Sequence, residues 1–193
     1  MIKIAIFASG TGSNALKIIQ HFDQRSDIEF VVLANRKEAG VLEKAKQLNV
    51  DGHYFSKSAF SDGTVLDFLK KEDVNFIILA GFLLLIDKNI LNYFDQKVVN
   101  IHPALLPNYG GKGMYGINVH KAVVKNKESV SGITIHYCNQ EYDEGQYILQ
   151  ATTAIEATDS PEEVAAKVLK LEHFYFPRVI EQLISEFSLQ EAN

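Results

Sequence analysis

Short apolar runs alternate with amphipathic helical patterns through the first half of the chain, and this alternation restricts the possible folds more than any other feature. Residues 2–8, 28–34 and 74–80 are almost continuously apolar, as strands buried on both faces of a sheet are. Between them, residues 14–22 and 38–49 place apolar side chains along one side of a helix. Strands and helices that alternate in this way are typical of right-handed βαβ units.

The second half of the chain departs from this pattern. Residues 130–138 and 146–153 are strand-like and are joined by a turn that contains Gly145, so we expect them to pair antiparallel. A long amphipathic helix over residues 161–187 closes the chain, with Ser160 as its N-cap. Shorter elements complete the prediction: strands near 53–55 and 97–101, and helices near 64–72 and 116–126. The predicted fold class is α/β, with a mainly parallel central sheet, an antiparallel C-terminal edge and helices on both faces.

Composition narrows the class of protein further. The chain has 193 residues, which fits a single Rossmann-like domain over residues 1–193, and its one cysteine allows no internal disulfide. The formal net charge of −5 disfavours non-specific binding to nucleic acid, which needs a basic surface. The apolar run at the N-terminus is too short for a membrane span and does not have the form of a signal peptide. We therefore predict a cytoplasmic protein with no nucleic-acid partner and no membrane partner.

A glycine-containing segment, SGTGSN at residues 9–14, joins the first strand to the first helix. Glycines allow a tight turn there, and the free N–H groups at a helix start attract an anion. A dinucleotide fingerprint would need a third glycine where Ala15 stands, and a P-loop would need a following Gly-Lys-Ser/Thr. We expect the segment to bind a phosphate group, with Ser13 or Asn14 as the N-cap. The alternative is a turn that needs glycine for its geometry alone.

An amide and an imidazole close the strand predicted near 97–101. Because side chains alternate along a strand, Asn100 and His102 point to the same side, and Ile101 points to the other. An asparagine can donate a hydrogen bond to a developing oxyanion, and a histidine can donate or shuttle a proton near neutral pH. The pair suits acyl chemistry. The alternative is a histidine that only caps a loop.

The turn between the two antiparallel strands carries three carboxylates. Asp143 is the candidate to orient a nearby imidazole and to favour its charged form, with Glu141 and Glu144 as competing candidates. An ordinary acidic turn is the simpler interpretation of all three.

Three further features bear on possible sites. The run AGFLLLI over residues 80–86 either belongs to the core or forms the wall of a slot for a flat heterocycle. The six histidines lack the spacing of a zinc motif, so we predict no metal site. Cys138 alternates with His136 and Thr134 along a strand, and we interpret it as a core or near-core side chain.

Taken together, these segments resemble the phosphoribosylglycinamide formyltransferase family. The motifs that carry the resemblance follow one another in order along almost the entire chain: SGTGSN, LAGF, NIHPALLP, the D-x-G turn followed by ILQ, and LEHFYFP. The NIHP-x-LLP stretch with the distal aspartate is shared with other formyltransferases. SGTGSN and the LEH segment are the parts that single out this family.

The resemblance implies a role for each matching segment. It implies acceptor-substrate contacts at the first turn and on the last helix: Gly12, Ser13, Asn14, Leu169, Lys170, Leu171 and Glu172. It implies a folate slot that is formed by Leu83, Leu84, Leu85, Ile86, Asn100, Asn139, Gln140, Glu141, Tyr142 and Asp143. It implies a catalytic trio of Asn100, His102 and Asp143.

The implied reaction moves the formyl group of 10-formyltetrahydrofolate, the cosubstrate, to the amine of 5-phosphoribosylglycinamide in de novo purine biosynthesis. Asn100 and protonated His102 would stabilise charge on the formyl oxygen, and His102 would help to pass a proton to the leaving folate nitrogen. Asp143 would hold the imidazole in its charged form. Residues 1–100 would then be the phosphate-binding half, and residues 101–193 would carry the catalytic loop, the edge strands and the last helix.

Several positions depart from the family pattern. Residues 83–86 lack the arginine that is common after AGF, and Gly63 stands where some members have an arginine. Ala104 replaces the usual serine of HPSLLP. A histidine that is common after Gly111 is absent, which makes Lys112 a candidate substitute cation.

Other functions remain open at this point. Formyltetrahydrofolate hydrolase and formyltransferases that act on aminoacyl-tRNA or amino sugars share part of the motif set. A nucleotide-binding regulatory module without catalysis is the alternative outside the enzymes. The hydrolase and the tRNA enzyme normally carry an extra domain, which we do not expect in this chain. We expect the chain to act on small-molecule substrates as a monomer or a weak homodimer.

Overall fold

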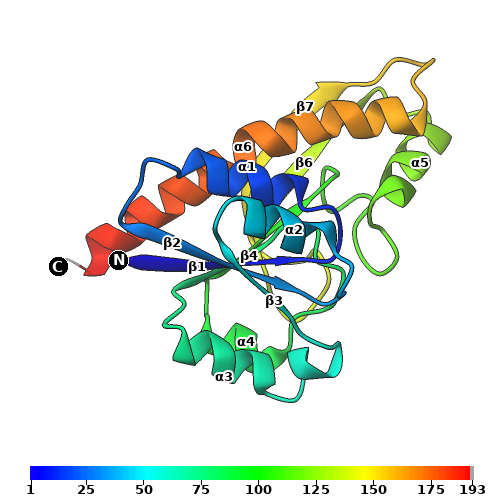
Figure 1. Cartoon of the computed structure of the whole chain (residues 1–193). Helices are drawn as coiled ribbons and strands as arrows, with labels where there is room; N and C mark the ends of the chain where they lie inside the picture. The colour runs from blue at the N-terminus through cyan, green and yellow to red at the C-terminus, as the bar shows by residue number, and fades with distance from the viewer. Residues whose placement is uncertain (192–193) are drawn as a thin grey trace.

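The computed structural model describes residues 1–191, and its elements follow the predicted alternating order (Figure 1). The strands are β1 (Ile2–Ala8), β2 (Ile28–Ala34), β3 (Asp51–Tyr54), β4 (Phe76–Leu79), β5 (Val98–His102), β6 (Val130–Tyr137) and β7 (Tyr147–Ala154). The helices are α1 (Ser13–His21), α2 (Gly40–Gln47), α3 (Thr64–Lys71), α4 (Lys88–Tyr93), α5 (Ile117–Lys125) and α6 (Pro161–Glu191), with a 3₁₀ turn at Ser58–Phe60.

The seven strands form one sheet in the order β3-β2-β1-β4-β5-β6-β7. β1 to β5 run parallel to one another, whereas β6 pairs antiparallel with both β5 and β7. The predicted α/β class with an antiparallel C-terminal edge is confirmed. The chain reverses its direction of winding between β1 and β4, and in open α/β sheets ligands bind beyond the carboxyl ends of the strands at such a point.

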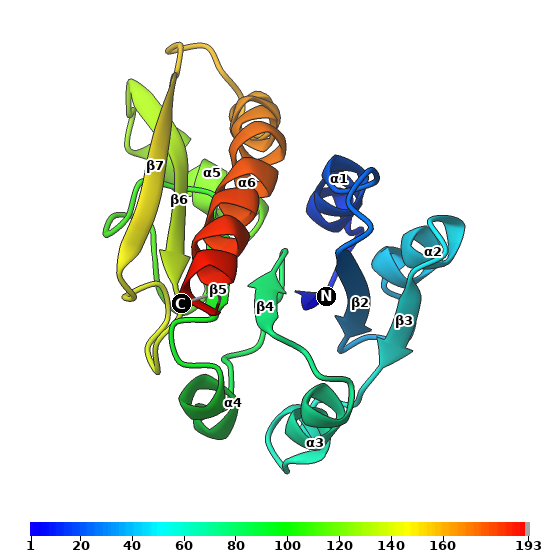
Figure 2. The same cartoon turned by 90° about the vertical axis from the view of Figure 1, so that its left-hand side faces the viewer.

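Each face of the sheet buries alternate side chains of the same strands. On β1, Ile4 and Ile6 belong to the core cluster that includes side chains of α1, α2 and α6. Ala5 and Phe7 belong to the cluster that includes side chains of α3 and α4. Figure 2 shows these two groups of helices on opposite sides of the sheet. Because both faces are covered, the strand must be apolar at every position, which explains its continuous apolar sequence.

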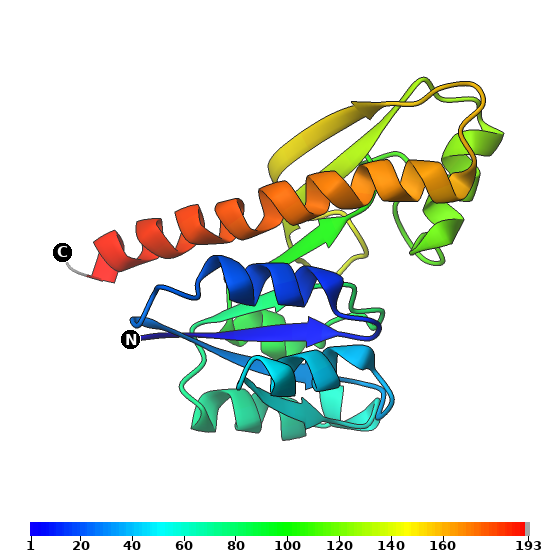
Figure 3. The same cartoon turned by 45° about the horizontal axis from the view of Figure 1, so that its top comes forward.

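Helix α6 begins where the sequence predicts. Pro161 is its first residue, and the Ser160 hydroxyl accepts from the Glu163 N–H while the Glu163 carboxylate accepts from the Ser160 N–H. This reciprocal pair is a capping box, so the predicted N-cap is confirmed. The helix continues beyond residue 187 to Glu191 and lies beside α1 and α5 (Figure 3). It therefore bridges the two halves of the chain.

The predicted start of α1 is wrong in one respect. The N-cap is Gly12, in a left-handed conformation, and neither Ser13 nor Asn14 caps the helix with its side chain. The sequence analysis also did not predict α4, a helix of six residues that begins after Asp87. The Asp87 carboxylate accepts from the Asn89 N–H at 2.9 Å, which stabilises a helix too short for a periodic pattern to reveal.

None of the helices within residues 1–191 is long and apolar enough to cross a membrane.

We predict that Gly12→Ala destabilises the fold. Gly12 has φ +74°, and a Cβ there would lie 2.5 Å from the Cγ2 atom of Val41 at the start of α2. The variant would combine an unfavourable backbone conformation with overpacking, so we expect a loss of about 1–3 kcal/mol in the free energy of unfolding, measured by urea titration. Gly10→Ala is the matched control, because nothing lies within 4 Å of the Cβ it would gain. Equal stability of the two variants would contradict this account.

Candidate active site

A cleft of about 700 Å³ lies beyond the carboxyl ends of β1, β4 and β5. Its walls come from segments far apart in the sequence: the start of α1, the loop after β4, the end of β5, the loop before α5, α5 itself, the turn after β6, and α6. The residues of the predicted trio all line it: Asn100, His102 and Asp143. The topology therefore brings Asp143 to Asn100 and His102, which lie more than forty positions before it in the sequence.

Asn100 is oriented by a histidine on the neighbouring strand. Asn100 and His136 are register partners of β5 and β6, and the Asn100 Nδ2 donates to the His136 Nε2 at 3.1 Å. The His136 Nδ1 lies 2.9 Å from the Tyr137 carbonyl. Because a carbonyl can only accept, the His136 proton is on Nδ1, and Nε2 is left to accept. This contact fixes the plane of the Asn100 amide where it lines the cleft.

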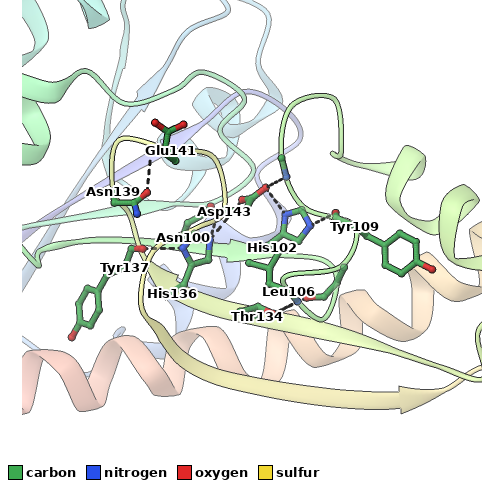
Figure 4. Close-up of polar contacts among 12 residues, drawn as sticks. Asn100, His102, Leu106, Tyr109, Thr134, His136, Tyr137, Asn139, Glu141 and Asp143 are labelled. Atoms are coloured by element: carbon green, nitrogen blue, oxygen red, sulfur yellow. Dashed lines mark hydrogen bonds and ion pairs between the residues drawn. The ribbon is translucent and has the colours of Figure 1, made fainter.

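His102 lies between two acceptors (Figure 4). Its Nε2 donates to the Tyr109 carbonyl at 2.8 Å, and its Nδ1 lies 3.4 Å from the Asp143 Oδ2. The side chain is only 4% exposed. A ring that carries a proton on each nitrogen satisfies both acceptors, and such a ring can give up one proton during a reaction.

Asp143 is the charged centre of the group. Its Oδ1 lies 3.7 Å from the His136 Nε2, and its Oδ2 accepts from the Gly111 N–H at 2.9 Å in addition to facing His102. Burial alone would raise the pKa of Asp143, but the contact with His102 and the hydrogen bond from the Gly111 N–H hold it well below its usual range. The carboxylate is therefore ionised whenever the site is folded near neutral pH.

The loop that follows His102 is anchored beneath the cleft. The Thr134 hydroxyl donates to the Ala104 carbonyl at 2.7 Å and accepts from the Leu106 N–H at 3.0 Å. Gln150 on β7 donates to both the Thr134 hydroxyl and the Leu106 carbonyl. These contacts join β5, β6, β7 and the loop, and they hold the backbone that carries the Tyr109 carbonyl toward His102.

A second polar group lines the other side of the cleft. The Asn14 Nδ2 on α1 donates to the Glu172 Oε2 on α6 at 2.6 Å. Burial raises the pKa of Glu172, although the Asn14 contact and the charge of His102 oppose this shift. Two segments that the sequence analysis proposed for the acceptor substrate therefore meet in space.

The apolar wall is formed by the loop after β4. The residues Leu83, Leu84, Leu85 and Ile86 all line the cleft, together with Tyr142 from the turn after β6. The Leu83 N–H donates to the Ser9 hydroxyl at 3.0 Å, which ties this loop to the end of β1. An apolar wall opposite a few polar groups suits a flat heterocyclic ligand.

The predicted site residues divide into those that line the cleft and those that do not. The cleft is lined by Asn14, Leu83, Leu84, Leu85, Ile86, Asn100, His102, Asn139, Glu141, Tyr142, Asp143, Leu169 and Glu172, and Lys112 also lines it. Gln140 lines an adjoining cleft instead, and Leu171 packs against the core. Gly12, Ser13 and Lys170 are not among the lining residues.

His136 is the residue that the sequence analysis missed. It was noted only as a neighbour of Cys138, whereas the structure places it between Asn100 and Asp143. The signal was its position opposite Asn100 in a β5–β6 pair, but the sequence predicted antiparallel pairing only for β6 with β7. Cys138 also lines the cleft, and burial raises its pKa, which disfavours a thiolate.

Within residues 1–191, no group of three or more histidine, cysteine, aspartate or glutamate side chains is arranged to hold a metal ion.

Known proteins resemble the chain over nearly its whole length. The model of the formyl transferase family matches residues 2–180. The chain is 40% identical to the chloroplastic phosphoribosylglycinamide formyltransferase of Arabidopsis thaliana, over 95% of this chain and 66% of the plant protein. It is 34% identical to the phosphoribosylglycinamide formyltransferase of Bacillus subtilis, over 95% of each chain.

Solved structures agree with these relatives. The phosphoribosylglycinamide formyltransferase of Anaplasma phagocytophilum superimposes with a TM-score of 0.87 at 26% identity, over 96% of this chain and 88% of the other. That of Streptococcus pneumoniae gives a TM-score of 0.84 at 31% identity, over 95% and 99%.

The chain therefore belongs to the formyl transferase family. Within that family, the relatives and structures named above are phosphoribosylglycinamide formyltransferases, so the resemblance predicted from the motifs is confirmed. The chain spans about two thirds of the length of the Arabidopsis relative and nearly all of the Bacillus relative.

We predict that Asp143 contributes stability that depends on pH. Its pKa in the folded protein lies below the unfolded value of about 3.9, so the contribution is present above that value and is lost as the pH falls below it. The wild type should exceed Asp143→Asn in free energy of unfolding by more at about pH 7 than at about pH 3. Urea titration at the two pH values measures this difference. An equal difference between the two proteins at both pH values would contradict an ionised, hydrogen-bonded Asp143 carboxylate in the folded protein.

We predict that His136 positions Asn100 rather than acting on a ligand itself. His136→Leu removes the acceptor for the Asn100 amide, so the amide loses its fixed orientation and we expect turnover to fall by up to about 100-fold. His136→Gln offers an amide oxygen near the position of Nε2 and should recover much of the loss. The readout is kcat, with substrate KM values changing little. Equal kcat values for the two variants would refute the positioning role.

Proposed function

We propose that this chain transfers the formyl group of 10-formyltetrahydrofolate to the amine of 5-phosphoribosylglycinamide. The observation that carries the proposal is the convergence of Asn100, His102 and Asp143 on one side of a cleft whose other side holds the Asn14–Glu172 pair. The first group of residues suits acyl chemistry. The Asn14–Glu172 pair lies at the start of α1, where the helix N–H groups suit a phosphate.

The acceptor would bind with its phosphate at the start of α1. Residues 12–14 open that helix, and the left-handed Gly12 turns the backbone so that the first N–H groups of the helix point away from its body. Binding by backbone N–H groups needs few cationic side chains, which agrees with a net charge of −5. Lys112 on the loop before α5 also lines the cleft and would add a positive charge for this anion.

The donor would place its heterocycle against the apolar wall of residues 83–86. A second, more open cleft shares this wall and Tyr142 with the first, and it is lined by Lys57 and Lys88 beside Asp87. The carboxylates of a folate glutamate tail would meet the two lysines there. This arrangement would replace the arginines that the sequence lacks at residues 83–86 and at Gly63.

The chemical step would begin with attack of the acceptor amine on the formyl carbon. A C–N bond forms, and negative charge develops on the formyl oxygen, where the Asn100 amide and the His102 N–H would donate hydrogen bonds. The bond to the folate nitrogen then breaks, that nitrogen takes up a proton, and the new amide nitrogen loses one. His102 would relay this proton directly or through a water molecule.

Asp143 and Tyr109 would govern the proton on His102. Asp143 faces Nδ1, whereas the Tyr109 carbonyl accepts the Nε2 proton. Donation from Nε2 to a substrate therefore requires the bond to Tyr109 to be exchanged for one to the substrate or to a water. The contacts with Asp143 and with the Tyr109 carbonyl hold the ring in position for that exchange.

We predict that the wild type releases tetrahydrofolate from 10-formyltetrahydrofolate only when 5-phosphoribosylglycinamide is present. Asn100→Ala and His102→Ala should each lower kcat by about 100- to 1000-fold, because each removes a hydrogen-bond donor to the oxyanion. Absorbance of the folate product follows the reaction. Lys125→Ala, on α5 outside the lining of the cleft, is the control and should leave turnover unchanged.

Other outcomes would assign a different function. Release of formate without the amine would indicate a formyltetrahydrofolate hydrolase, and transfer to an amino sugar would indicate the corresponding formyltransferase. No turnover with any acceptor would favour a binding module. Sedimentation of the same preparation tests the expected monomer or weak homodimer.

A further inference from the structure

His120 is a buried imidazole that the proposed reaction does not use. It lies on α5, lines the cleft and is only 5% exposed. Its Nδ1 is buried and has no hydrogen-bond partner within residues 1–191. A buried polar atom left in this state costs about 1–3 kcal/mol, and such atoms in folded proteins require an explanation.

Packing alone does not explain this histidine. A leucine would fill a similar space without the cost of an unpartnered nitrogen. Burial and the nearby charge of His102 lower the pKa of His120, so its ring is neutral near pH 7, with one nitrogen as donor and the other as acceptor. A neutral ring can bind a group that both donates and accepts.

A second unsatisfied atom lines the same cleft. The Asn14 Oδ1 is buried and also has no hydrogen-bond partner within the described residues, although its Nδ2 is bonded to Glu172. Asn14, His120 and Glu172 come from three different helices, and all three line the cleft between the start of α1 and His102. Together they offer more hydrogen-bonding capacity than they use among themselves.

We propose that His120 binds the acceptor substrate by a hydrogen bond from its ring Nδ1 to a ribose hydroxyl. The inference rests on the proposed function, in which the phosphate binds at the start of α1 and the amine reacts beside Asn100 and His102. The ribose is the part of the acceptor that lies between these points. Its hydroxyls both donate and accept, which matches a neutral imidazole. His120 is thus a specificity residue for the sugar and takes no proton in the reaction.

The first test compares two replacements of His120. His120→Leu keeps the bulk and removes the hydrogen bond, so we expect the acceptor Kd and KM to rise about three- to tenfold, with the donor KM and kcat little changed. His120→Asn places an amide near the position of Nδ1 and should recover part of the loss. Lys121→Ala, an exposed neighbour on α5, is the control and should behave as the wild type.

A structural role would give a different result. Because His120→Leu removes an unsatisfied polar atom, its free energy of unfolding should equal or exceed that of the wild type. An unchanged acceptor Kd in a folded His120→Leu variant would overturn the proposal. A fall in kcat with a shifted pH profile and an unchanged acceptor Kd would also overturn it, in favour of proton transfer.

The second test uses acceptors that lack one ribose hydroxyl. The wild type should bind the 2′-deoxy or the 3′-deoxy acceptor more weakly than 5-phosphoribosylglycinamide, and His120→Leu should lose this discrimination for one of them. Equal discrimination by both proteins would refute the contact. Calorimetry without the formyl donor measures these affinities. If the wild type binds the acceptor but does not formylate it, the proposed function fails, but the binding comparison can still be made.

Discussion

The carboxylate of Asp143 is the contact on which the arrangement of the site depends. It lies in the turn after β6, accepts from the Gly111 N–H of the loop before α5, and faces His102 on β5 and His136 on β6. Four segments therefore meet at one ionised group. Burial makes an unpaired carboxylate costly, so the carboxylate, the Gly111 N–H and the His102 ring hold one another in place. Asp143, a residue of the turn after β6, therefore connects the segments that form the site.

The antiparallel edge of the sheet makes this contact possible. β6 runs antiparallel to β5, so the end of β6 at Tyr137 lies beside Val99, and the turn after β6 folds back along β5 to bring Asp143 to His102. The same pairing sets His136 opposite Asn100 and Thr134 opposite His102. One strand pair thus supplies an orienting histidine for the amide and an anchor for the loop after β5.

Much of the fold could be predicted because the apolar pattern has a local cause. A strand covered on both faces must be apolar throughout, and the capping box is formed by Ser160 and Glu163, which are close in the sequence. The start of α1 could not be predicted in the same way. At Gly12 the close approach of Val41, which is distant in the sequence, leaves no room for a side chain. The six-residue α4 is too short to show a period.

The chain by itself determined the class of fold and the resemblance to a formyltransferase family, and it made Asn100, His102 and Asp143 the candidate trio, because strand periodicity and motif order are properties of neighbouring residues. Only the tertiary structure decided which groups face one another. It placed His136 beside Asn100, the Tyr109 carbonyl on His102, and a buried, unpartnered His120 in the same cleft. These contacts depend on strand register and on helix packing across the sheet, and no local pattern in a single sequence encodes either of them.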